Sequence, residues 1–233
     1  MEFPEYPYSK QQEAASSFMY KVYGWMSFAL AITAAIAFYI SQNPVMYSYV
    51  RRSPWLLIVL IIVQFAIVIG ISASIMRMTY STAVLLFMLY AASVGVTMSL
   101  IIGSYTPASV YTVFLVTSLT FVSMSLYGYF TKADLTSWGS FGFMALIGII
   151  IASVVNIFLR NPMFNLIISY IGVFVFILLT AYDTQKLKQL GSALMPSEQA
   201  RKKIAIFGAL TLYLDFINLF LFMLRIMGQG KQD

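Results

Sequence analysis

The stretch PWLLIVLIIVQFAIVIGISASIM, residues 54–76, decides the fold, because it holds no Asp, Glu, Lys or Arg. A membrane-spanning helix needs about 20 consecutive, mainly apolar residues, and this stretch supplies 23. It opens with Pro54, which suits the first turn of a helix because the N–H that proline lacks would have no partner there. The stretch therefore predicts a transmembrane helix.

Similar runs fill most of the chain. Of its 233 residues, 61% are hydrophobic and only 9% are charged, whereas a soluble domain carries about 25% charged residues. The charge-free run 78–131 is too long for one span, and its segment GSYTPAS at 103–109 predicts a turn because Gly and Pro interrupt helices there. We therefore expect an all-α membrane protein with seven transmembrane helices, over 22–41, 54–76, 79–102, 107–130, 138–159, 163–182 and 204–224.

This pattern divides the chain into three parts. We expect a cytoplasmic N-terminal tail over 1–21, a seven-helix transmembrane domain over 22–225 and a short C-terminal tail over 226–233. The segment TQKLKQLGSALMPSEQARKK at 184–203 is predicted as the one long hydrophilic connection. A re-entrant hairpin in place of the seventh span is the alternative for the end of the chain. On the fifth span, small residues at helical spacing predict close packing against a neighbouring helix: Gly142, Ala145, Gly148 and Ala152.

The residue inventory excludes several kinds of site. The chain has no Cys and no His, so disulfides, thiolate nucleophiles, Cys/His zinc sites and Ser-His-Asp triads are not possible. The net charge of +6 does not indicate nucleic acid here, because cytoplasmic loops of membrane proteins are rich in Lys and Arg. Nine of the 14 basic residues lie on the side of the N-terminus, which predicts a cytoplasmic N-terminus.

Two carboxylates within apolar surroundings are the candidate functional groups. Asp215 lies in LYLDFINLF at 212–220, inside the seventh span, and Asp183 lies in TAYDTQ at the end of the sixth. An ionised Asp costs roughly 2.5–3.5 kcal/mol at the centre of a membrane, so an acid in that position indicates function and a partner. Consecutive antiparallel spans bring the two aspartates to similar depths if the sixth helix continues through LKQL at 187–190.

Two carboxyl groups in one dry site share protons and titrate as a unit. Such a pair senses pH, and its oxygens suit brief contact with a divalent cation such as Ca²⁺. Arg77, at the end of the second span, is the candidate latch that pairs with an ionised aspartate and releases it on protonation. Four neighbouring polar side chains are expected to support the carboxylates by hydrogen bonds: Tyr182, Thr184, Tyr213 and Asn218.

The segments TAYDTQKLK (180–188) and ALTLYLDFINLFLFMLRIMG (209–228) resemble the signature segments of the Bax inhibitor family, also called the transmembrane Bax inhibitor motif family. YGWMSFAL (23–30) and MSLYGYFTKADLTSWG (124–139) are similar to its bacterial members, and the resemblance covers essentially the whole chain. It implies a central seventh helix wrapped by the other six, and a pH-sensitive Ca²⁺ leak. The family's aspartyl pair falls on Asp183 and Asp215, and its arginine latch falls on Arg77.

The leading functional expectation is therefore a Ca²⁺ leak channel or transporter, not an enzyme. It would have no tightly bound cofactor, Ca²⁺ as the transported ion and the lipid bilayer as its surroundings, in a bacterial inner membrane. One alternative is a regulatory partner of another membrane protein, such as a protease or an insertion machine, without transport. The other is an intramembrane aspartyl protease, although Asp215 follows Leu-Tyr-Leu where those enzymes carry a Gly-x-Gly-Asp segment.

Overall fold

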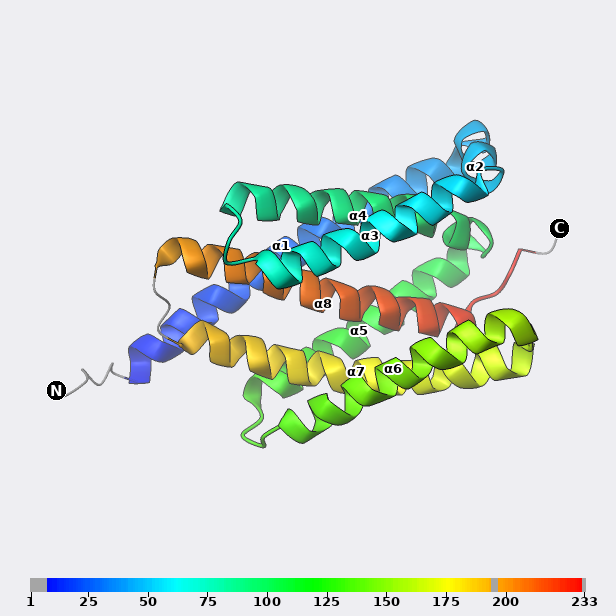
Figure 1. The fold of residues 1–233 in the computed structure, drawn as a ribbon. Helices are drawn as coiled ribbons and strands as arrows, with labels where there is room; N and C mark the ends of the chain where they lie inside the picture. Colours follow the sequence, from blue (N-terminus) through cyan, green and yellow to red (C-terminus); the bar gives the residue numbers. More distant parts are fainter. Residues whose placement is uncertain (1–7, 194–196, 232–233) are drawn as a thin grey trace. The chain divides into compact units, whose positions relative to one another are not determined.

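The computed structural model describes residues 8–193 and 197–231, and the regular elements of these residues are all α-helices (Figure 1). In chain order they are α1 (Tyr8–Gln42), α2 (Pro44–Arg51), α3 (Pro54–Ser74), α4 (Tyr80–Gly103), α5 (Pro107–Phe130), α6 (Thr136–Leu159), α7 (Pro162–Ser192) and α8 (Glu198–Met227). All of them except α2 are long and apolar enough to cross a membrane. The seven predicted spans are thus confirmed.

Local capping chemistry explains the helix boundaries. The turn between α6 and α7 shows it most fully: Arg160 adopts a left-handed conformation with φ 51° and ends α6. The Asn161 side chain then accepts hydrogen bonds from the backbone N–H groups of Met163 and Phe164, at 2.9 and 3.2 Å. These bonds satisfy amides that have no partner within the helix. Proline fills the first position of four helices, at Pro44, Pro54, Pro107 and Pro162.

The structure differs from the sequence-based expectation at polar segments. The first helix begins at Tyr8, within the tail expected over 1–21, and an additional short helix, α2, follows it. The connection at 184–203 is mostly helical, because α7 continues to Ser192 and α8 begins at Glu198; predicting it as a loop was wrong. A polar segment therefore indicates where an apolar span ends, but a helix can continue through it.

The last span is a single helix. Over Glu198–Met227, α8 is unbroken for 30 residues, which at 1.5 Å per residue is about 45 Å. A re-entrant hairpin would need a turn within it, so that alternative is wrong.

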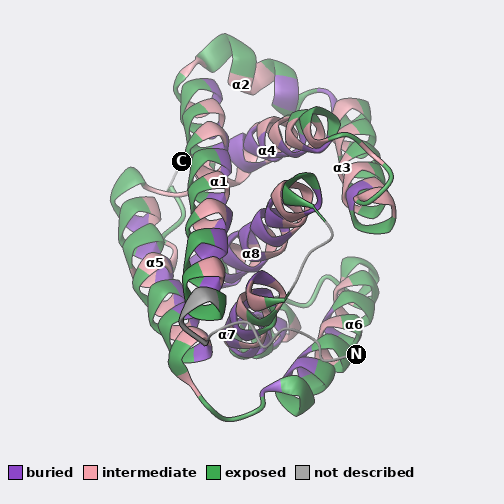
Figure 2. Cartoon of the chain, turned by 90° about the vertical axis from the view of Figure 1, so that its left-hand side faces the viewer, coloured by how far each residue is buried: buried purple, intermediate pink, exposed green. Residues whose placement is uncertain are grey.

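The helices differ greatly in how far they are buried. In the most apolar window of α8, 61% of residues are buried, against 6% in α3, and in Figure 2 the ribbon of α8 is largely purple where that of α3 is green and pink. High burial of α8 is what a helix surrounded by others requires. The wrapping of α8 by the other six helices stays a prediction.

The chain forms two compact units. Unit 1 comprises Met1–Ile101 with Lys186–Tyr213, and unit 2 comprises Ile102–Gln185 with Leu214–Asp233. Two helices pass from one unit to the other along their length: α7 changes unit between Gln185 and Lys186, and α8 changes unit between Tyr213 and Leu214.

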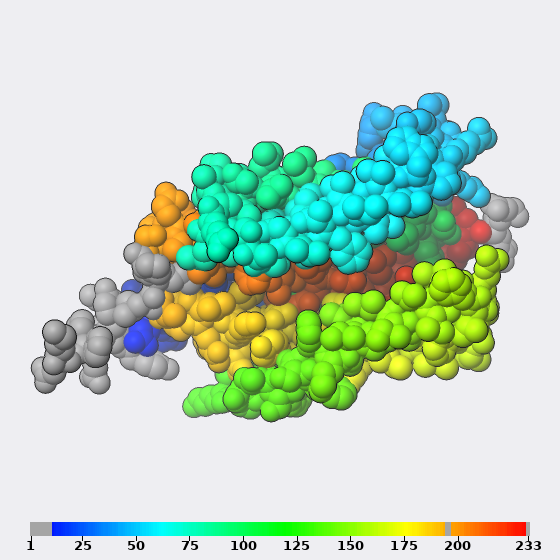
Figure 3. All heavy atoms as spheres, in the orientation of Figure 1, coloured from blue at the N-terminus to red at the C-terminus, as the bar shows by residue number. Residues whose placement is uncertain are grey.

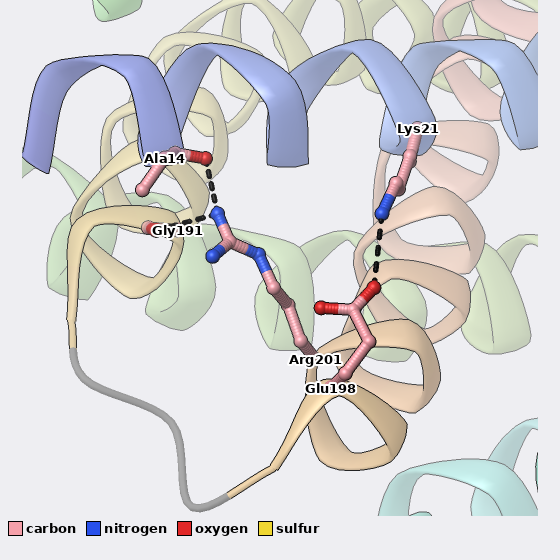
Figure 4. A network of polar contacts seen from close by, with 5 residues as sticks. All are labelled: Ala14, Lys21, Gly191, Glu198 and Arg201. Carbon is pink, nitrogen blue, oxygen red and sulfur yellow. Dashed lines mark hydrogen bonds and ion pairs between the residues drawn. The ribbon is translucent and has the colours of Figure 1, made fainter. Parts of the chain in front are cut away.

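Unit 1 is held together near the α7–α8 connection by polar contacts (Figure 4). The Arg201 guanidinium donates to the carbonyl of Ala14 on α1 and, at 3.2 Å, to that of Gly191 on α7. Lys21 and Glu198 form an ion pair at 3.2 Å, with side chains 40% and 60% exposed, and an exposed pair of this kind contributes about 0–1 kcal/mol. The Arg201 contacts therefore hold the start of α8 to α1 and α7 more strongly than the ion pair does.

Candidate functional site

Unit 2 brings the two predicted aspartates together. Asp183 on α7 is half-buried, whereas Asp215 on α8 is only 4% exposed. Asp183 lies close enough to Asp215 to act on it both as a charge and as a side-chain hydrogen-bond partner. Because a carboxylate cannot donate, the two carboxyl groups can bond to each other only when one of them carries a proton.

The surroundings of Asp215 are apolar. Its neighbour in sequence, Phe216, makes edge-to-face contacts with Phe114 and Phe121 of α5, at ring-centroid distances of 5.8 and 5.4 Å. The Oδ2 atom of Asp215 is buried and has no hydrogen-bond partner among the described residues. An unpartnered buried oxygen costs about 1–3 kcal/mol, so this atom is the least satisfied polar atom of the site.

The residues of α7 on either side of Asp183 each contact α5 or α6. Gly128 of α5 lies so close to the Ala181 carbonyl that a Cβ at Gly128 would collide with it. Gly139 of α6 packs on the Tyr182 ring, which a Cβ would approach to 2.6 Å. The Thr184 hydroxyl donates to the Ser125 hydroxyl at 3.4 Å. These contacts leave Asp183 little freedom to move away from Asp215.

Gln185 is a supporting residue that sequence reasoning missed. Its amide nitrogen donates to the carbonyl of Ala133 at 2.7 Å, and its oxygen accepts the N–H of Leu135 at 3.0 Å. Gln185 thereby ties the α5–α6 loop to α7 two residues after Asp183. Its position beside the charged segment KLK gave no indication of this, since a glutamine there is typical of an exposed helix end.

Three of the four predicted supporting residues have other partners in the structure. The Tyr213 hydroxyl is bonded to Thr33 at 2.7 Å, within unit 1. Asn218 donates to the Leu214 carbonyl of its own helix at 2.8 Å, and Thr184 donates to Ser125. They therefore position helices, and their direct role toward the carboxylates stays a prediction.

Arg77, the predicted latch, lies in unit 1, in the turn that follows α3, and its side chain is exposed. The turn is held from α8, because the Lys203 ammonium donates to the carbonyls of Met76 and Met78 at 2.7 and 3.2 Å. Lys203 thus binds the backbone of the residues on either side of Arg77. That Arg77 acts on the aspartates stays a prediction.

The site offers little to a resident metal ion. The described residues contain no group of three or more carboxylate, Cys or His side chains that would hold one. Two carboxyl groups present hard oxygen ligands, but Ca²⁺ takes 6–8 oxygens in a stable site. Contact of the pair with a passing Ca²⁺ ion stays a prediction.

The chain matches the protein family described as "Inhibitor of apoptosis-promoting Bax1" over residues 15–232. The inner membrane protein YbhL of Escherichia coli (strain K12) is 47% identical over 216 residues, which cover 92% of each chain. Uncharacterized proteins of Borreliella burgdorferi and Deinococcus radiodurans are each 41% identical, covering 94% and 93% of this chain and 94% and 92% of their own lengths. The chain, with its seven membrane-spanning helices, therefore belongs to the Bax inhibitor family of multi-pass membrane proteins.

Proposed function

We propose that this protein is a pH-sensitive leak for Ca²⁺, gated by protonation of the Asp183–Asp215 pair, with Arg77 as the latch. The observation that carries the proposal is the close pairing of the Asp183 carboxyl group with the buried Asp215, whose Oδ2 has no hydrogen-bond partner among the described residues. Interior acids in membrane helices mark ion and proton pathways.

The mechanism follows from the charge of the pair. With one shared proton the pair carries a single negative charge, which holds the Arg77 guanidinium. A second proton neutralises the pair and removes that attraction, so the closed packing loses a charge-assisted contact. Acid thereby shifts the equilibrium toward the open state, as a two-state element does when one state binds the proton better. The titratable group that acts on Asp215 within unit 2 is Asp183, on α7.

The test is Ca²⁺ flux into proteoliposomes of the purified protein, scanned from pH 5.5 to 8. Flux of the unmodified chain should rise on acidification, by at most about tenfold per pH unit for one controlling proton. Asp215→Asn removes the titratable group and should give a flat profile. The matched control is Asp134→Asn, because Asp134 is an exposed aspartate that accepts hydrogen bonds from Thr136 at the start of α6. A normal pH profile in Asp215→Asn would overturn the proposal.

An aspartyl protease needs the same two carboxyl groups, with one acting as base while the other donates a proton. The sequence before Asp215 does not fit such an enzyme, so we prefer transport. Incubation of the reconstituted protein with a membrane-spanning peptide separates the two: cleavage that is lost in both Asp183→Asn and Asp215→Asn would support the protease. A partner role without transport predicts a complex that survives both substitutions, in the absence of any flux.

A further inference from the structure

The short helix α2 is built as a fixed element rather than a loose connection. At its start, the Asn43 side chain accepts hydrogen bonds from the N–H groups of Val45 and Met46, both at 3.1 Å. At its end, the N–H of Arg52 donates to the Ser48 carbonyl at 3.0 Å. Caps at both ends stabilise a helix that would be too short to form by itself.

One face of α2 is apolar and uncovered. Val45 is 76% exposed and Tyr49 is 60% exposed, and Arg52 is exposed as well. These three residues follow one another at i, i+4 and i+7, so they share a face. Val50 is buried and turns the opposite side of the helix toward the protein. A face that runs from an aliphatic side chain through an aromatic one to a guanidinium is typical of helices that lie in a membrane interface.

This face lies next to the uncovered apolar surface of α3. On α3, the five most exposed large side chains recur every three or four residues along one stripe, and other exposed apolar side chains flank it: Trp55, Ile58, Ile62, Phe65 and Ile69 form the stripe, and Val59, Ile61 and Val63 lie beside it. Since α3 is a membrane-spanning helix, its uncovered stripe faces the acyl chains. Helix α2 packs against α1 and α3 and lies beside the start of α3, the end that carries Trp55 (Figure 3). Tryptophan at a helix end marks the level of the lipid headgroups.

We propose that α2 lies in the membrane–water interface on the side reached after the first span, and that Arg51 and Arg52 bind the phosphate of anionic glycerophospholipids there. Both arginines are exposed, Arg52 on the face of Val45 and Tyr49 and Arg51 beside it at the last position of the helix. A guanidinium binds phosphate through two parallel hydrogen bonds, while Val45 and Tyr49 enter the acyl region. The occupant of this face is thus lipid, and the helix selects lipids by charge.

The chain has no Cys, so single cysteines can be labelled without background. A spin label on Val45→Cys, in nanodiscs, should be relaxed more by oxygen than by a water-soluble nickel chelate. Ile62→Cys on the α3 stripe is the lipid-facing control, and Lys132→Cys, exposed in the α5–α6 loop, is the aqueous control. A Val45 label that behaves like the Lys132 label places α2 in water and overturns the proposal. A label shielded from both relaxants means that protein covers the face, which also overturns it.

The lipid preference has its own measurement. A bimane fluorophore is attached at Val45→Cys, and its quenching is measured with brominated phosphatidylglycerol and, separately, with brominated phosphatidylcholine. The ratio of the two quenching efficiencies gives the local preference for the anionic lipid. Each of Arg51→Gln and Arg52→Gln should lower that preference roughly fivefold. Arg160→Gln, which removes an exposed arginine from unit 2, should leave it unchanged. Equal preference in the unmodified protein and in the Arg51→Gln/Arg52→Gln double variant rules out the proposed headgroup site.

Discussion

Thr33 has one hydroxyl proton and two hydrogen-bond partners. Its Oγ lies 2.9 Å from the Ala91 carbonyl and 2.7 Å from the Tyr213 hydroxyl. A carbonyl only accepts, so Thr33 must donate to Ala91 and accept from Tyr213. Tyr213 is fully buried, with edge-to-face contacts to Phe87 and Tyr90. This chain of bonds fixes α8 to α1 and α4 within unit 1.

The direction of these bonds predicts unequal losses. Tyr213→Phe removes a single donor and should cost about 0.6–1 kcal/mol of stability. Thr33→Val leaves the buried Tyr213 hydroxyl without an acceptor and also removes the hydrogen bond to the Ala91 carbonyl. It should therefore cost about 1–3 kcal/mol of stability. Thermal unfolding of the two variants in detergent measures the order. A larger loss for Tyr213→Phe would mean that the protons are arranged differently.

Glycine substitutions test the close helix crossings. Gly128→Ala places a methyl group against the Ala181 carbonyl. Because this carbonyl belongs to the backbone of α7 and cannot easily move aside, we expect a loss of about 1–3 kcal/mol or more in the free energy of unfolding. Gly148→Ala is the matched control because nothing lies within 4 Å of its position. Thermal unfolding of both variants provides the comparison. If Gly128→Ala is as stable as Gly148→Ala, the crossing of α5 and α7 is looser than the structure shows.

At the level of elements, Gln185 links α7 to the α5–α6 loop. Gln185→Met keeps the length of the side chain but loses both bonds to Ala133 and Leu135, so backbone amides of residues 131–136 should exchange hydrogen faster. Gln189→Met is the control on the same helix, because Gln189 is exposed. Hydrogen exchange read by mass spectrometry reports the difference. Unchanged exchange in Gln185→Met would show that other contacts hold the loop.

Lys203 provides an element-scale test of the latch. Lys203→Met releases the carbonyls of Met76 and Met78, which should loosen the turn that carries Arg77. We expect the Ca²⁺ leak at pH 8 to rise, by about five- to thirtyfold if about 1–2 kcal/mol of hydrogen bonding is lost, while flux still responds to pH. Lys202→Met is the control, since it removes an equal charge next to it. Flux at pH 8 equal to that of the control would mean that the turn is held without Lys203.

At the scale of the molecule, the sequence predicted the spans and the acidic pair for a physical reason. Charge-free runs determine which segments enter a membrane, and an acid within such a run stands out. The capped helix α2, the continuation of α7 to Ser192 and the role of Gln185 depend on contacts between distant segments, and a local pattern carries no sign of these. The stripe from Gly142 to Ala152 shows the same limit: Gly142 packs closely on Leu179, but Gly148 meets no neighbour. Composition indicated that close packing was possible there, and not which residue would provide it.

The whole chain has no histidine, the side chain whose ordinary pKa lies between pH 5 and 8. Asp134 does not replace it, because hydrogen bonds from Thr136 lower its pKa below the ordinary value. A lowered pKa gives stability that is present above the ordinary pKa of aspartate and lost only in stronger acid, which lies outside this range. The buried aspartyl pair is then the expected source of any pH response between 5.5 and 8.

The melting temperature tests this for the molecule as a whole. The unmodified protein should change in melting temperature between pH 5.5 and 8, and Asp183→Asn/Asp215→Asn should not. Asp134→Asn is the control and should keep the pH response of the unmodified protein. Scanning calorimetry or a thermal shift in detergent gives these values without any transport assay, so the result stands apart from the flux experiment. A double variant whose melting temperature still follows pH would place the proton-sensitive group elsewhere in the chain.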